Sequence, residues 1–182
     1  MKRIFSICCL LVFAFLLYSC GNAKQEKLYL EQDEYGAYQG DEYVTSCVDL
    51  GYLADRCQFD WIGSLFDIPI EDLNTKRGIH IGSTLDEIAT AYEGIHFSCS
   101  TQDIYDESIE TLVQNIDTSE SFEITTWTYF ETRKYMLGEG VPVSDEKELS
   151  ELKASGACLQ VQLIFKVQDA VVTDLILFAN EK

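Results

Sequence analysis

The sequence predicts an α+β fold in which helices pack on one face of an antiparallel β-sheet. Three features support this prediction: a capped amphipathic helix after residue 84, a strand rich in aromatic and β-branched residues from Phe122, and an alternating hairpin near the C-terminus. Amphipathic helices combined with antiparallel strands bury their apolar surfaces by packing the helices on the sheet.

The first residues have the pattern of a bacterial signal peptide. Lys2 and Arg3 precede an apolar run, residues 4–17, which is shorter than the roughly 20 residues needed to cross a bilayer. The run ends in Leu17-Tyr18-Ser19-Cys20, which resembles the lipobox of bacterial lipoproteins. The resemblance implies that residues 1–19 are a signal peptide and that the thiol of Cys20 carries a lipid. The alternative is an ordinary secretory peptide with a chance cysteine.

The lipobox also implies where the protein resides and how it is organised. We expect a lipid anchor in the cell membrane or the outer membrane, with the folded part outside the cytoplasm. Residues 20–42 are expected to be the lipidated N-terminus and a flexible tether, because they mix Glu, Asp, Gly and Tyr. Residues 43–182 are expected to form a single α+β domain. Within it, the segment from Tyr43 to Leu73 is apolar without a clear period.

Residues 78–94 carry the clearest local pattern, a strand followed by a helix. Gly78–Ile81 predicts a short strand, and Thr84 with Glu87 predicts a capping box at the start of the helix. Gly94 is expected to end the helix in a left-handed conformation. Apolar residues recur with helical spacing and define one buried stripe: Leu85, Ile88, Ala89 and Tyr92.

This unit resembles one found in many small exported bacterial proteins. The matching residues are Gly78-Ile79-His80-Ile81-Gly82-Ser83-Thr84 and Tyr92-Glu93-Gly94. Similar domains occur in the beta-lactamase inhibitor proteins and in small outer-membrane assembly lipoproteins. The resemblance implies a helical pair packed on an antiparallel sheet and a function in binding proteins. The sequence departs from the pattern at Glu93, which separates the tyrosine from the glycine.

The middle of the chain predicts a strand, a helix and a second strand. Ile95–Cys99 is expected to be a strand, and the segment from Phe122 to Tyr135 a long strand, since it is rich in Thr and aromatic residues. Between them, apolar residues with helical spacing predict an amphipathic helix with this face: Tyr105, Ile109, Leu112, Val113 and Ile116.

The C-terminal part predicts a short helix and a hairpin. A polar helix is expected over Asp145–Ala154, with Ser144 as its cap and Gly156 as its end. Residues 159–167 alternate between apolar and polar side chains, and a turn near Asp169 leads into a second strand, Val171–Phe178.

The acidic composition limits the range of partners. The chain has 31 Asp and Glu residues against 13 Lys and Arg residues, a formal net charge of −18. Such a surface repels phosphate backbones, so nucleic acid is not expected as a partner. The charge could attract cations or a basic protein, or it could serve solubility alone.

Four cysteines remain after the signal peptide and Cys20, and an even number in an exported domain is compatible with disulfides. Sequence alone permits three pairings. We favour Cys47–Cys57 as a local loop and Cys99–Cys158 as a link between strands. Buried free thiols are the alternative.

No pattern of catalytic or metal-binding residues is present. His80 and His96 each lie between apolar neighbours in expected strands, and neither has metal-ligand spacing. The sequence contains no Gly-x-Ser-x-Gly, no phosphate-binding glycine loop and no His-Glu-x-x-His. We therefore expect no catalytic residues, no metal and no cofactor.

The aromatic residues of the long central strand are the best candidates for a binding surface. Trp127, Tyr129 and Tyr135 are expected to share one face of this strand, and Trp and Tyr are enriched at protein interfaces. Burial of these residues under a helix is the alternative. The sequence therefore favours a non-enzymatic lipoprotein that binds an envelope or extracellular protein or peptide. A small-ligand or cation-binding lipoprotein is the second hypothesis, and a hydrolase with dispersed carboxylates is the third.

Overall fold

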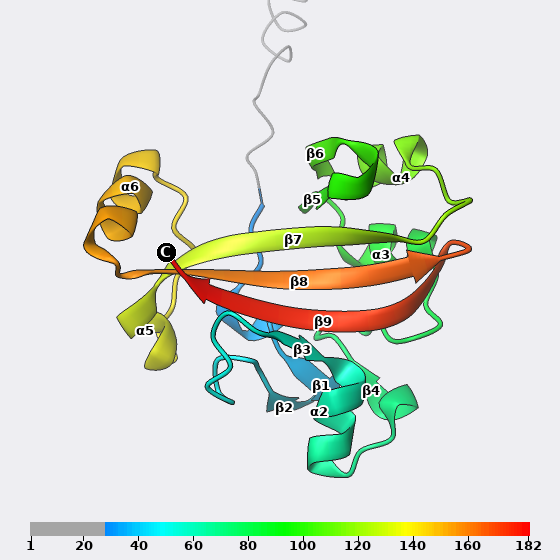
Figure 1. Ribbon diagram of the computed structural model, residues 1–182, viewed down its shortest axis with the longest axis horizontal. Coiled ribbons are helices and arrows are strands. Elements are labelled where there is room, and N and C mark those ends of the chain that lie inside the picture. Colours follow the sequence, from blue (N-terminus) through cyan, green and yellow to red (C-terminus); the bar gives the residue numbers. More distant parts are fainter. Residues whose placement is uncertain (1–27) are drawn as a thin grey trace, which may run out of the picture.

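Two long C-terminal strands and the strand before them form the centre of the fold (Figure 1). β7 (Phe122–Glu131), β8 (Cys158–Gln168) and β9 (Val171–Glu181) pair antiparallel in the computed structural model. The expected hairpin is present, and its tight turn uses Asp169 and Ala170, both with positive φ. The structure describes residues 28–182. The predicted signal peptide, Cys20 and residues 20–27 of the predicted tether lie outside this range.

The three long strands belong to a six-stranded sheet in the order β3-β9-β8-β7-β5-β6. Its shorter strands lie at the two edges: β3 (Arg56–Gln58) pairs with β9, while β5 (His96–Cys99) and β6 (Ile104–Ser108) extend the sheet beyond β7. A separate three-stranded sheet has the order β2-β1-β4. Its strands are β1 (Ala37–Gln39), β2 (Glu42–Thr45) and β4 (Leu73–Asn74).

The helices of the described residues are short. The α-helices are α2 (Phe59–Phe66), α3 (Leu85–Ala91), α4 (Ile109–Asn115), α5 (Thr132–Met136) and α6 (Glu146–Ser155). The 3-10 helices are η1 (Gln32–Glu34), η2 (Ile70–Asp72) and η3 (Ser100–Gln102). These helices and the two antiparallel sheets confirm the predicted α+β class. No helix within residues 28–182 has the length and apolar character needed to cross a membrane.

The main core lies against one face of the six-stranded sheet, called here the inner face. From this face Leu163 and Phe165 of β8 project into the core, and both are fully buried. Helix α3 packs there through Tyr92, whose ring lies 5.5 Å from that of Phe165, while Phe97 of β5 lies 6.0 Å from it. Leu30 and Tyr35, which flank η1, and Leu73 of the small sheet belong to the same core cluster.

The predicted start of α3 is confirmed in detail. The hydroxyl of Thr84 accepts a hydrogen bond from the Glu87 amide at 3.2 Å, and the Glu87 carboxylate accepts one from the Thr84 amide at 2.7 Å. Glu87 carries a lowered pKa because the Thr84 backbone and hydroxyl donate to its carboxylate. The strand expected over Gly78–Ile81 is reduced to one bridge between His80 and Asn74.

The predicted boundary between tether and domain is wrong for residues 28–42. Leu30, Tyr35 and Ala37 are completely buried, and η1 and β1 lie within this segment. The apolar side chains that occur among the acidic residues and glycines therefore belong to the core. The domain begins before residue 43, and only residues 20–27 remain as the predicted tether.

Two other element boundaries differ from the prediction. The helix expected to include Tyr105 begins only at Ile109, because residues 104–108 pair as strand β6 with β5 and Ser108 caps the helix. Tyr105 is consequently exposed. Helix α6 is present as predicted, with Gly156 in the left-handed conformation at its end, but its N-terminal cap is Asp145 and not Ser144.

Candidate functional site

The outer face of the six-stranded sheet carries two of the three aromatic residues predicted to bind a partner. Burial alternates along β7: Phe122, Ile124 and Phe130 are buried on the inner side, whereas Trp127 and Tyr129 are half-buried on the outer side. In Figure 1 this face of β7, β8 and β9 is turned toward the viewer, with α3 behind the strands. Of the described helices, none crosses the middle of it.

Strand pairing assembles three rows of side chains on this face, which we call the open sheet face. Trp127 is level with Gln162 and Phe178, and Tyr129 is level with Gln160 and Asn180. The third row contains Thr125, Ile164 and Ile176. Phe178 and the three amide side chains were not predicted as site residues. The alternation of β8 and β9 was visible in the sequence, but the register that brings these residues beside Trp127 was not.

Charged side chains flank the uncharged rows of the open sheet face. Its three rows contain no Asp, Glu, Lys or Arg. Toward one end of these rows, Arg56 of β3 forms an ion pair of 2.7 Å with Glu123 of β7, so the pair links two strands that β9 and β8 separate in the sheet. At the other end the ammonium of Lys153, from α6, lies 4.1 Å from the centre of the Tyr129 ring, and Gln160 donates to the Tyr129 hydroxyl at 3.3 Å. Aromatic and amide groups on a charge-free surface are typical of the centre of a protein interface.

Tyr135 does not share this face, so that part of the prediction is wrong. β7 ends at Glu131 because the amide of Thr132 donates to the carbonyl of Ala157 and the chain turns into α5. The Tyr135 side chain is buried, and its ring lies 5.0 Å from that of Phe130 on the inner side. It lines a pocket on the opposite side of the sheet.

This pocket, called here the tyrosine pocket, has a volume of about 650 Å³. It lies between η1, the small sheet and the segment that follows α5. Its walls include Glu31, Gln32, Asp33, Tyr38, Tyr43, Ser46, Asp49, Lys76, Tyr135, Gly138 and Gly140. The volume is in the range of sites that bind small molecules or peptide side chains. The residues before Tyr43 were missed because they were assigned to the tether.

Two walls of the tyrosine pocket are held together by one side chain. The Gln32 amide donates to the Tyr135 carbonyl at 2.7 Å and accepts from the Gly140 amide at 2.7 Å. A Cβ atom at position 140 would lie 2.5 Å from the Gln32 side-chain oxygen, so only glycine allows this close approach. η1 and the segment after α5 are therefore linked although they are far apart in the sequence.

Two tyrosines of the pocket, Tyr38 and Tyr43, are neutral hydrogen-bond donors. Tyr43 donates to the Asp49 carboxylate, which also accepts from the Ser46 hydroxyl at 3.0 Å. Tyr38 donates to the Asp33 carbonyl at 2.7 Å. Burial raises the pKa of Tyr38 to about 12, assisted by the charges of Asp33 and Glu34. Burial and the hydrogen bond to Asp49 raise the pKa of Tyr43.

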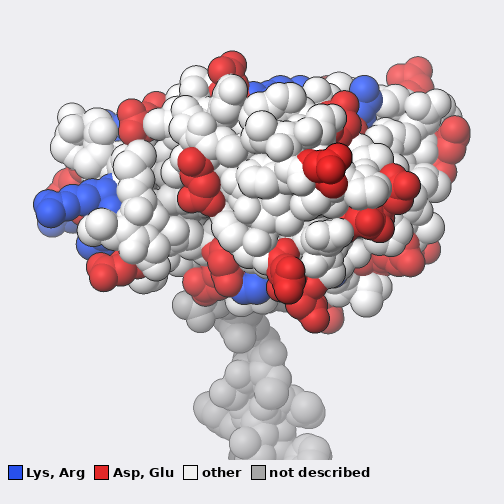
Figure 2. All heavy atoms as spheres, turned by 90° about the horizontal axis from the view of Figure 1, so that it is seen from below, with Lys and Arg blue, Asp and Glu red and all other residues white. Residues whose placement is uncertain are grey.

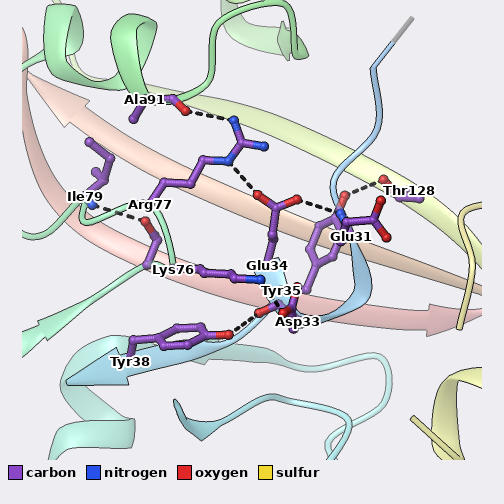
Figure 3. A network of polar contacts seen from close by, with 11 residues as sticks. Glu31, Asp33, Glu34, Tyr35, Tyr38, Lys76, Arg77, Ile79, Ala91 and Thr128 are labelled. Atoms are coloured by element: carbon purple, nitrogen blue, oxygen red, sulfur yellow. Dashed lines mark hydrogen bonds and ion pairs between the residues drawn. The ribbon is translucent and has the colours of Figure 1, made fainter. Parts of the chain in front are cut away.

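A buried polar network fixes η1 beneath the pocket (Figure 3). The Glu34 carboxylate binds the Arg77 guanidinium at 2.5 Å and accepts the Glu31 amide at 2.7 Å. Arg77 also donates to the Ala91 carbonyl at 2.8 Å, and Tyr35 donates to the Thr128 hydroxyl at 2.6 Å. These contacts connect η1 to α3 and to β7.

All four cysteines are buried thiols, and only one predicted pair is adjacent. Cys47 donates a hydrogen bond to Cys57, which raises the pKa of Cys47 and lowers that of Cys57. The Cys99–Cys158 link is wrong. Ser98, next to Cys99, pairs with Thr125 and so lies in the row of Ile164, six residues along β8 from Cys158. At roughly 3.3 Å per residue this separation is about 20 Å, far beyond the reach of a disulfide.

The two histidines, His80 and His96, lie outside both the open sheet face and the tyrosine pocket. His96 contacts the Asp106 carbonyl at 2.8 Å and the His80 ring contacts the Ile81 carbonyl at 2.8 Å. Within residues 28–182, no group of three or more His, Cys, Asp or Glu residues is arranged to hold a metal ion.

The chain matches no protein-family model, no curated protein and no solved structure. Its function is therefore inferred from its residues and their geometry.

Proposed function

We propose that the chain is a membrane-anchored extracytoplasmic lipoprotein with a non-enzymatic domain that binds another envelope or extracellular protein. The lipobox Leu17-Tyr18-Ser19-Cys20 supports the anchor, with the lipid on Cys20. Acidic side chains are spread over the face shown in Figure 2, and the chain has 31 Asp and Glu residues against 13 Lys and Arg residues. This charge makes nucleic acid an unfavourable partner.

The observation that carries the proposal is the open sheet face. Trp127, Tyr129 and Phe178 are half-buried there, on a face that the described helices leave uncovered at its centre. Large aromatic side chains supply most of the affinity in many interfaces, where a few residues dominate. The absence of charge in the three rows contrasts with a chain of net charge −18, so this region differs in chemistry from the rest of the surface.

The partner expected from this chemistry is a protein surface with apolar groups and neutral hydrogen-bonding groups. Gln162 and Asn180, which are half-buried, can each donate and accept, and they flank the aromatic rings. The exposed ion pair of Arg56 and Glu123 links strands on either side of β9 and β8, so a partner bound to this face would also contact these charged groups.

The test is a crosslinking pull-down from intact envelopes. The tagged full-length protein is compared with a Trp127→Ala/Tyr129→Ala variant, and a Tyr105→Ala/Phe66→Ala variant serves as the control, since both of those aromatic residues are exposed elsewhere. We expect one envelope protein to be captured by the wild type and by the control, and to be lost in the first variant. Capture that is equal in all three proteins would contradict the proposal.

A second experiment tests the anchor separately. Cys20→Ala removes the thiol to which the lipid would be attached, so the variant should leave the membrane fraction and lose labelling by a fatty acid. Retention of both membrane association and label in the variant would contradict lipidation at Cys20.

Binding of a small ligand or cation is a second candidate function, favoured by the tyrosine pocket and its volume of about 650 Å³. A hydrolase using dispersed carboxylates was the third hypothesis from the sequence. No contact among the described residues favours it.

A further inference from the structure

The tyrosine pocket contains more negative charge than its single lysine neutralises. Three carboxylates, from Glu31, Asp33 and Asp49, line the pocket together with one ammonium, from Lys76. The lining therefore carries an excess of two negative charges. Since the pocket lies between η1 and the segment after α5, on the other side of the sheet from Trp127, it is independent of the open sheet face.

The two aspartates of the pocket differ in what they bind. Asp33 forms an ion pair with the Lys76 ammonium. Among the described residues, Asp49 accepts hydrogen bonds from two hydroxyls, those of Tyr43 and Ser46, and from no cation. The pocket thus already holds one alkylammonium group against one carboxylate. The second carboxylate is held in position by neutral donors and has no counter-charge.

The rest of the pocket suits the stem of such a cation. The rings of Tyr38 and Tyr43 lie in a T-shaped arrangement with centres 5.4 Å apart, and Tyr43 is packed against Gly36, where a Cβ atom would lie 2.4 Å from its ring. Tyrosine rings attract cations and contact methylene groups.

We propose that the tyrosine pocket is a binding site for an alkylammonium or guanidinium cation, with Asp49 as the carboxylate that pairs with it and Tyr38 and Tyr43 as the walls that contact its stem. The cation can come from two sources, a free amine or the side chain of a basic peptide. Both sources share the same chemistry, an elongated apolar stem that ends in a positive charge.

The test is isothermal titration calorimetry on the full chain purified in detergent. Three probes are compared: 1,5-diaminopentane, acetyl-Gly-Lys-Gly-amide and acetyl-Gly-norleucine-Gly-amide. We expect at least one of the two cationic probes to bind about tenfold more tightly than the norleucine peptide, because the latter has the same stem without the charge. The tighter of the two cationic probes identifies the source. Binding should weaken as the salt concentration rises.

Two variants locate the charge that binds the probe. Asp49→Asn keeps an acceptor for Tyr43 and Ser46 but removes the negative charge, so it should weaken binding about tenfold. Lys76→Gln removes the internal cation from Asp33, so it should tighten binding about threefold. Asp55→Asn is the matched control, since it makes the same change in net charge at an exposed position outside the pocket.

The outcomes separate a specific site from general attraction. Equal loss of affinity in Asp49→Asn and Asp55→Asn would show only non-specific attraction to an acidic protein and would overturn the proposal. Absence of binding by both cationic probes at about 10 mM would also overturn it. Circular dichroism checks the fold of each variant. If Asp49→Asn fails to fold, Lys76→Gln decides, because a residue with only a structural role would not tighten binding when replaced.

Discussion

The two faces of the β7–β8–β9 sheet are built from the same strands but have different surroundings. On the inner face Leu163, Phe165 and Leu177 are completely buried in the main core, in contact with residues from α3 and β5. On the outer face Ile164 and Ile176 are also buried, yet they do not belong to that core cluster. Their neighbours in the sheet, Thr125, Trp127 and Phe178, are only half-buried.

This difference shows what alternation along a strand can and cannot predict. The period of two predicts which residues share a face, because successive side chains point to opposite sides. It does not predict which face other elements will cover. Both faces of this sheet carry apolar side chains. The inner face forms the main core because η1, α3 and the small sheet pack on that side.

The largest difference in the free energy of unfolding is expected when a phenylalanine is truncated on the inner face and, in a second variant, on the outer face. Phe165→Ala should lower the free energy of unfolding by about 3–5 kcal/mol, because it leaves a cavity between Tyr92 and Phe97. Phe178→Ala on the outer face should lower it by about 1 kcal/mol. Urea unfolding followed by tryptophan fluorescence gives both values. Equal losses would mean that the outer face is also covered, and would remove the contrast between the faces.

Breaking an ion pair should also lower the free energy of unfolding more on the inner side of the sheet than on the outer side. Both losses should be smaller than the loss for Phe165→Ala. Glu34→Gln should lower the free energy of unfolding by about 2–3 kcal/mol, because it leaves Arg77 without its counter-charge in a largely buried position. Glu123→Gln breaks the exposed pair with Arg56 and should cost below about 1 kcal/mol. Each substitution removes one carboxylate charge and keeps the shape of the side chain, so the two variants control for each other in urea unfolding.

The elements that could be predicted from the sequence are those governed by local rules. The capping box of Thr84 and Glu87 satisfies backbone amides within one turn, so its residues alone identify the start of α3. The β8–β9 hairpin was recognisable because both strands are long enough to show their period. β1, β2 and β4 have two to four residues each, too few for any period to be visible.

The candidate sites depend on contacts between distant residues, which the sequence did not reveal. Gln32 binds the backbone of Tyr135 and Gly140, and this contact brings the supposed tether against the segment after α5. On the open sheet face, Trp127 and Tyr129 were predicted as candidates, but Phe178 is level with Trp127 only through the register of two strand pairs. Tyr135 was assigned to the wrong face because the end of β7 depends on a hydrogen bond from Thr132 to Ala157.

The smallest effect expected is a change with pH in the free energy of unfolding, caused by Asp174 on the outer face. Burial raises the pKa of its carboxyl group, although Gln58 donates to the carboxylate at 2.7 Å and the amide of Leu175 at 2.8 Å. A carboxyl group whose pKa is higher in the folded state disfavours folding once it is ionised. The contribution of Asp174 to stability should therefore decrease as the pH rises from the unfolded pKa, near 3.9, through the folded pKa.

Asp174→Asn isolates this contribution, since it keeps an acceptor for Gln58 and cannot ionise. The free energy of unfolding of the wild type, minus that of the variant, should fall as the pH rises above the unfolded pKa, near 3.9, and other titrating groups cancel in this difference. Because Asp174 keeps part of its contact with water, the change should stay below about 1 kcal/mol. A difference that rises over this range would mean that Gln58 and Lys166 outweigh burial. The ionised carboxylate of Asp174 would then stabilise the folded state, although it lies beside the uncharged rows of the outer face.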